Sequence, residues 1–91
     1  MNGAEYIAEF LRQRSVEKVF LITGGACAFI VDAIARNPGL DYVCMQHEQA
    51  SAMAADSLWR IKRTVGATLS TSGPGATNLL TGIACSYFDS I

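Results

Sequence analysis

Glu48 is the residue of this chain with the clearest potential for proton chemistry. It follows an apolar segment, residues 40–45, that is typical of a buried strand, and it precedes an Ala- and Met-rich segment typical of a helix. Open α/β sheets bind their ligands outside the carboxyl ends of the strands, at junctions of this kind. The structural alternative is an acid favoured by the dipole of the first helical turn. Position alone favours the structural role, and the rest of the chain reverses this preference.

A glycine-rich turn, residues 73–78, is the second candidate for chemistry. Two glycines around Pro74 let the backbone approach a ligand closely where a helix begins. One alternative is a tight strand-to-helix turn that binds nothing. Another is a dinucleotide phosphate site, but the third glycine of that motif is missing, and no lysine follows as a Walker loop requires.

Other reactive residues have weaker patterns. Cys44 and His47 have a spacing that resembles a zinc site, but no partner pair accompanies them, so we reject zinc and expect His47 to be structural. Ser72 does not lie in the G-x-S-x-G turn of a serine hydrolase. Cys27, Cys44 and Cys85 are an odd number of cysteines, and we interpret them as reduced, buried, small apolar residues.

The apolar pattern predicts helices that alternate with strands. Asn2 and Glu5 have the spacing of a capping box at the start of the first helix. Pro74 suits the first turn of the last helix, whose apolar residues predict burial on most sides. This order is typical of an α/β protein with a parallel sheet. The expected strands are 19–22, 41–45 and 65–70; helices are expected from residue 2, around 30–34 before a stop at 37–39, over 47–60, and from residue 74.

Size and composition narrow the possible functions. Ninety-one residues, 51% of them hydrophobic and 16% charged, make at most one small domain with extensive apolar surface to bury. A net charge of -1 without a basic stripe argues against binding to nucleic acid. No apolar stretch is long enough to predict a membrane span, and the first residues lack a signal-peptide pattern. The reduced cysteines lead us to expect a cytoplasmic protein. Three open parallel strands make a poor independent domain, and we therefore expect part of a longer protein.

Taken together, three stretches resemble the N-terminal, pyrimidine-binding domain of thiamine-diphosphate-dependent enzymes, most closely the acetolactate synthase group. The chain departs from the family pattern at Ile22-Thr23, where Tyr-Pro is common, and at residues 57–59, where Gly-Tyr-Ala is usual. Residues 61–64 also lack the usual glycine that ends the third helix. The resemblance implies a flavodoxin- or Rossmann-like three-layer fold with helices on both faces of a parallel sheet, of which residues 1–91 form an incomplete, N-terminal part. The stretches are 19–26 with 32–34, 47–56, and 71–84.

The resemblance also assigns roles to individual residues. In this family a glutamate at the position of Glu48 hydrogen-bonds N1′ of the cofactor's aminopyrimidine, and so helps the 4′-nitrogen to remove the C2 proton. Gly24, Gly25, Pro74 and Asn78 are implied to lie along the same ring. We expect burial beside the apolar ring to raise the pKa of Glu48.

The implied reaction makes or breaks a carbon–carbon bond next to a carbonyl, by decarboxylating a 2-oxo acid such as pyruvate and transferring the activated aldehyde. The resemblance implies a small-molecule substrate and a homo-oligomer, either a dimer or a tetramer. It also implies Mg²⁺ held with the diphosphate by a domain absent from these residues, and in many relatives FAD. We expect no metal ligands in this chain, and no activity from it alone. The alternative is a truncated product that acts only as an interaction module or has no function.

Overall fold

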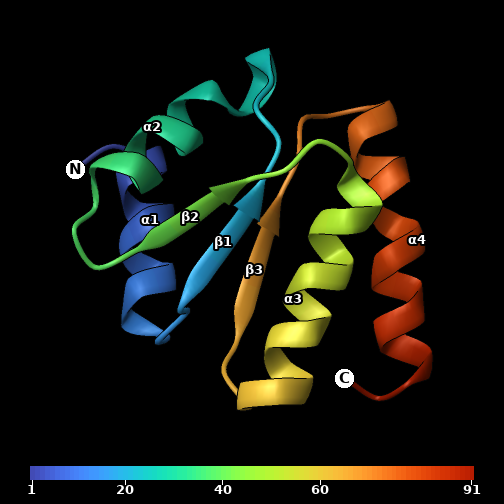
Figure 1. Cartoon of the computed structure of the whole chain (residues 1–91). Coiled ribbons are helices and arrows are strands. Elements are labelled where there is room, and N and C mark those ends of the chain that lie inside the picture. Colours follow the sequence, from blue (N-terminus) through green and yellow to red (C-terminus); the bar gives the residue numbers. More distant parts are fainter.

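The chain forms a parallel sheet with helices on both faces, as seen in a computed structural model that describes residues 1–91 (Figure 1). The α/β fold class predicted from the sequence is confirmed. No helix is both long enough and apolar enough to cross a membrane. The elements in chain order are α1 (Gly3–Gln13), β1 (Lys18–Leu21), the short 3-10 helix η1 (Gly25–Cys27), α2 (Ala28–Arg36), β2 (Asp41–Cys44), α3 (Glu48–Lys62), β3 (Gly66–Leu69) and α4 (Pro74–Phe88).

The sheet has the strand order β2-β1-β3, and both pairings are parallel. Leu21, at the end of β1, is in register with Cys44 at the end of β2 and with Leu69 at the end of β3. All three strands therefore end at the same edge of the sheet. The loops that leave this edge contain both glycine-rich segments and Glu48.

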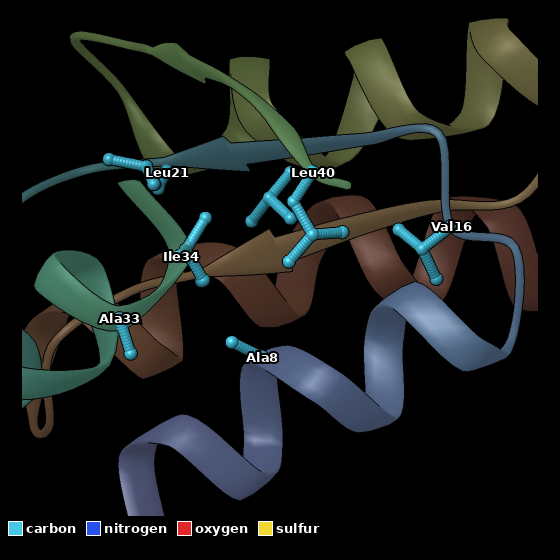
Figure 2. Packing of buried hydrophobic residues seen from close by; sticks show 7 residues of the cluster. Ala8, Val16, Leu21, Ala33, Ile34 and Leu40 are labelled. Atoms are coloured by element: carbon cyan, nitrogen blue, oxygen red, sulfur yellow. The ribbon is translucent and has the colours of Figure 1, made fainter. Parts of the chain in front are cut away.

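The core lies between the sheet and the pair of helices α1 and α2 (Figure 2). Val19 and Leu21 of β1 point into it, and their register partners in β3 pack against it from the sheet. Burial on this scale is the main stabilising contribution in a small domain. The cluster consists of Ala8, Val16, Val19, Leu21, Ala33, Ile34 and Leu40.

Helix α3 covers the other face of the sheet, over β1 and β3. At Gly66 of β3 the approach is close, because a Cβ there would lie 3.3 Å from Ala55 and from Leu58 of α3. Helix α4 packs mainly against α3, side by side with it in Figure 1. Gly82 permits that contact, since a Cβ on it would lie only 2.3 Å from the Cβ of Ala52.

Two helix ends show how local sequence determines local structure. The predicted capping box of α1 is present: Asn2 accepts from the amide of Glu5, and Glu5 accepts from the amide of Asn2. Helix α3 ends without the family's glycine, and Arg63 takes the left-handed conformation instead, with a φ of 57°. A non-glycine residue in that conformation is strained. The end of α3, where the sequence departs from the family, therefore carries backbone strain at Arg63.

The prediction that β2 is a buried strand is wrong. All its residues are exposed, including Tyr42 and Val43. The reason is its place at the edge of the sheet, since β2 pairs only with β1, and α3 lies over β1 and β3 instead. Cys44 shares this exposure, so its interpretation as a buried core residue is wrong as well.

The prediction that α4 is largely buried is also wrong. Leu80 and Ile83 are 59% and 46% exposed, and Tyr87 and Phe88 are exposed further still. The helix packs on α3 and only weakly on the sheet, so one face meets solvent. Cys85, on the same helix, is exposed rather than buried, whereas Cys27 is buried as expected, and all three cysteines are free thiols.

Candidate functional site

Glu48 is the first residue of α3 and lies at the edge where all three strands end. Its side chain is half-buried. The residue before it, His47, caps the helix, because its Nδ1 accepts a hydrogen bond from the amide of Gln49 at 3.2 Å. This contact agrees with the structural role expected for His47. It also orients the start of α3, and so the direction in which the carboxylate leaves the helix.

The closest partner of the Glu48 carboxylate is Asn78 on α4, which is thirty residues away in the sequence. Nδ2 of Asn78 donates to Oε1 of Glu48 at 2.9 Å. On its other side, Oδ1 of Asn78 accepts from Nε2 of Gln49 at 3.0 Å. The three side chains therefore form a chain of hydrogen bonds that joins α3 to α4 beside the edge of the sheet.

A raised pKa of Glu48 beside the cofactor ring stays a prediction, whereas in the chain by itself the pKa of this carboxyl is lowered. The hydrogen bond from Asn78 stabilises the ionised form and lowers the pKa of the carboxyl, with a further lowering from backbone hydrogen bonding within the residue. Burial acts in the opposite direction but is the weaker effect, because the side chain is only half-buried. At neutral pH Glu48 is thus a carboxylate, ready to accept a hydrogen bond or a proton.

The loop after β3 comes close to this carboxylate. Gly73 has a φ of 70°, which only glycine adopts without strain, and Pro74 follows as the first residue of α4. Gly75 is buried, and a Cβ on it would lie 3.0 Å from Cγ2 of Thr71 and 3.4 Å from Oε2 of Glu48. Glycine at position 75 therefore keeps the second carboxylate oxygen free of a neighbouring side chain.

The loop after β1 meets the loop after β3 at Gly24. A Cβ on Gly24 would lie 2.6 Å from the Cβ of Thr71, so the first loop can pass this close to the Thr71 side chain only because residue 24 is glycine. The three connections that follow β1, β2 and β3 thus converge on one small region. This is where open parallel sheets bind their ligands.

The structure brings some of the predicted site residues together and leaves others apart. Glu48 and Asn78 are in direct contact, and Gly24 joins them through Thr71 and the loop that holds Gly75. Gly25 and Pro74 lie at the same edge but are exposed, and neither makes a hydrogen bond with Glu48.

Two residues of this region were missed by sequence reasoning. Gln49 and Thr71 lie within the stretches 47–56 and 71–84, but neither was predicted as a site residue. Nothing in the spacing of Gln49 links it to Asn78, since the contact depends on how α4 packs against α3. For Thr71, the signal was the neighbouring glycine-rich turn, because such turns mark places where two backbones approach closely. No group of three or more His, Cys, Asp or Glu side chains is arranged as a metal site.

Comparison with known proteins agrees with this geometry. The chain matches the family described as "Thiamine pyrophosphate enzyme, N-terminal TPP binding domain" over residues 1–91. It is 47% identical over 91 residues to the acetolactate synthase isozyme 3 large subunit of Escherichia coli (strain K12), and 43% identical over 91 residues to the isozyme 2 large subunit. It is 46% identical over 90 residues to a probable acetolactate synthase large subunit of Methanocaldococcus jannaschii.

These alignments cover 99–100% of this chain but only 15–16% of each relative, so the chain spans about one sixth of the length of the curated proteins that it matches. The match to the family nevertheless extends over the whole chain, and it includes the strand-end loops that carry Glu48 and Asn78. The chain therefore belongs to the thiamine pyrophosphate enzyme family, and it corresponds to the N-terminal, cofactor-binding domain of that family.

Proposed function

We propose that residues 1–91 are the N-terminal part of the pyrimidine-binding domain of an acetolactate synthase-like enzyme, in which Glu48 is the catalytic carboxylate. The observation that carries the proposal is the position of this side chain. It lies where three parallel strands end, one oxygen is held by Asn78, and the other faces Gly75. A helix-start acid with only a structural role needs neither of the last two features.

The residues of this region fit an aminopyrimidine. The ring nitrogen N1′ is an acceptor, and a glutamate carboxyl group that carries a proton can donate a hydrogen bond to it. Oε2 of Glu48 makes no hydrogen bond to another side chain, so it remains available for this contact. Gly24, Gly25 and the turn around Pro74 offer backbone groups with little side-chain bulk, which suits a flat ring that lies against the chain.

When bound, thiamine diphosphate supplies a carbanion at C2 of its thiazolium ring, which is the nucleophile of such enzymes. The chain's own task is to control a proton. With the ring bound, the acid form of Glu48 would donate its proton to N1′, and the hydrogen bond from Asn78, which favours the ionised carboxylate, would favour this release of the proton. Asn78 keeps the carboxylate pointed toward that position, and His47 keeps the start of α3 in place.

By the same likeness we propose that the substrate is a small 2-oxo acid such as pyruvate, which is decarboxylated before the activated aldehyde is transferred. By the same likeness we propose that the diphosphate and Mg²⁺, and FAD where it is used, are held by parts of the enzyme outside residues 1–91. We also propose that the full-length enzyme is cytoplasmic and forms a homo-oligomer, either a dimer or a tetramer.

The test is a chimera in which this chain replaces the matched segment of the isozyme 3 large subunit, to which it is 47% identical. Hydrogen–deuterium exchange at cofactor C2 is then compared between the chimera and its Glu48→Gln variant. Glutamine keeps the shape of the side chain but removes the ionisable group. We expect exchange to slow by roughly 10²–10⁴-fold, the usual contribution of a general acid or base.

Two controls make the outcome decisive. Cofactor binding should change much less than exchange in Glu48→Gln, because the diphosphate is held elsewhere. The same measurement on Cys44→Ser, an exposed residue of the neighbouring strand, should leave exchange within a few-fold of the chimera. Equal exchange rates in the chimera and in Glu48→Gln would return Glu48 to a structural role. They would favour the alternative that this sequence has no catalytic part.

A further inference from the structure

Gln49 lies beside the catalytic carboxylate without touching it. It follows Glu48 in the first turn of α3, is half-buried, and directs its side-chain amide across to α4. There Nε2 donates to Oδ1 of Asn78 at 3.0 Å, while Nδ2 of Asn78 donates to Oε1 of Glu48 at 2.9 Å. The contact between Asn78 and Glu48 thus has a second supporting contact behind it.

An asparagine amide has two faces of opposite character, and rotation by half a turn exchanges them. If Asn78 rotated, its carbonyl oxygen would face the Glu48 carboxylate, and the two oxygens would repel each other. A donor that faces Oδ1 therefore stabilises the same orientation of Asn78 that the carboxylate requires. In this structure that donor is Gln49.

His47 does not provide the same control. Its Nδ1 accepts from the amide of Gln49, so a neutral ring carries its proton on Nε2. That nitrogen lies 3.4 Å from Nδ2 of Asn78, so two donors face each other there. A rotated Asn78 would instead place an acceptor near the ring. The imidazole accordingly favours the wrong orientation, and Gln49 opposes it.

We propose that Gln49 is a positioning residue, which fixes the amide of Asn78 so that its NH₂ group, and not its carbonyl, faces Glu48. This inference rests on the proposed function of Glu48, but it concerns only contacts within this chain. Such linked hydrogen bonds strengthen one another in surroundings of low dielectric. It follows that a change at position 49 reaches Glu48 only through Asn78.

The experiment measures the pKa of the Glu48 carboxyl by NMR titration of the 91-residue chain labelled with ¹³C in its glutamate side chains. Gln49→Met keeps the length of the side chain and removes the donor. It should raise the pKa of Glu48 toward the ordinary value. Gln49→Glu keeps the shape, replaces the donor with an acceptor, and should raise the pKa further. Gln46→Met is the matched control, since Gln46 is exposed and makes no side-chain hydrogen bond.

A double-mutant cycle separates positioning from other effects. In an Asn78→Leu background, Gln49→Met should no longer shift the titration of Glu48, and Gln49→Glu should retain only the through-space effect of its charge. Amide spectra of each variant show whether it is folded, and Asn78→Ser, whose hydroxyl is too short to bridge the two side chains, replaces any Asn78→Leu protein that is not. An unchanged pKa in Gln49→Met, or an equal shift in both backgrounds, would overturn the inference.

A second measurement distinguishes failure of this inference from failure of the proposed function. In the chimera, Gln49→Met should slow C2 exchange by up to about tenfold, the effect of one uncharged hydrogen bond, and thus far less than Glu48→Gln. If Glu48→Gln has no effect on exchange, the catalytic role is lost, while the NMR result still decides the role of Gln49. If exchange depends on Glu48 but its pKa ignores Gln49, only the present inference fails.

Discussion

The two flanks of the sheet are stabilised in different ways. On the flank of α1 and α2, the core is closed by the chain itself, and Leu21 and Ile34 are 0% and 1% exposed (Figure 2). On the flank of α3 and α4, Leu80 is 59% exposed, and an apolar cavity of about 390 Å³ lies between α3, β3 and α4. The buried hydrophobic contacts and the candidate site residues therefore lie on opposite flanks of the sheet. The flank of α1 and α2 contains the hydrophobic core that stabilises the fold, whereas the flank of α3 and α4 contains Glu48 and Asn78.

The second flank depends on a few specific contacts. Helix α4 meets α3 at the close approach of Gly82 to Ala52 and through polar links near its end. There Asp56 accepts from Ser86 at 2.6 Å and pairs with Arg60. Because Asn78 is on α4 and Glu48 is on α3, these contacts also determine the distance between the two site residues.

The largest expected effect contrasts the same substitution on the two flanks. Leu21→Ala removes a fully buried side chain, and should lower the free energy of unfolding by roughly 2–5 kcal/mol. Leu80→Ala removes an exposed one, and should change it by less than about 0.5 kcal/mol. Urea unfolding followed by circular dichroism measures both. Similar losses in the two variants would show that α4 is buried in solution, and that the flanks do not differ.

The next effect concerns the contact between α3 and α4. Gly82→Ala places a Cβ where only 2.3 Å is available, and such overpacking costs about 1–3 kcal/mol. Alanine recovers about 1 kcal/mol through its helix propensity, which leaves a net loss of up to about 2 kcal/mol. Adding Ala52→Gly removes the opposing Cβ and should restore most of the lost stability. If the double variant is no more stable than Gly82→Ala, the helices are not in the contact described.

A pH effect should also arise on the second flank. Hydrogen bonding to Arg60, followed by that to Ser86, lowers the pKa of Asp56 below its usual value in peptides, about 3.9. The folded state therefore binds this proton less tightly than the unfolded state. The resulting stability is present above about pH 3.9, and is lost as the pH falls through the lower, folded-state pKa.

Asp56→Asn should remove this part of the acid dependence, as measured by thermal unfolding between about pH 2 and pH 5, the range around the peptide value. Ser86→Ala is the graded control. It removes only one of the two interactions, and should weaken the dependence without abolishing it. An acid dependence identical in all three proteins would contradict the prediction.

The smallest expected effect compares helix ends on the two flanks. Ser15 after α1 and Arg63 after α3 both have positive φ, 59° and 57°. Arg63→Gly removes backbone strain but loses the contact with Trp59 and frees the unfolded chain, so stability should rise by a few tenths to about 1 kcal/mol. Arg63→Ala keeps the strain and should give no gain. Ser15→Gly, which has no ring contact to lose, should gain at least as much as Arg63→Gly.

Much of the fold was predictable because the chain's patterns are local. The apolar run of β1, expected at 19–22 and found at Lys18–Leu21, is covered on both faces, and such strands are read directly from continuous hydrophobicity. The capping box of α1 and the start of α4 at Pro74 depend on neighbouring residues only. The family was also predictable, since its motifs are contiguous, and the match to residues 1–91 confirms it.

Local sequence patterns alone thus specify the alternation of strands and helices and the family, and they single out Glu48 as a candidate site residue. The tertiary structure alone decided which apolar residues are buried. Val43 and Leu80 are as hydrophobic as the core, but they lie on an edge strand and on an outer helix. It also decided the state of Glu48, whose pKa is lowered because α4 brings Asn78 within 2.9 Å, with Gln49 behind it. These contacts join residues about thirty positions apart, and no local pattern encodes such a distance.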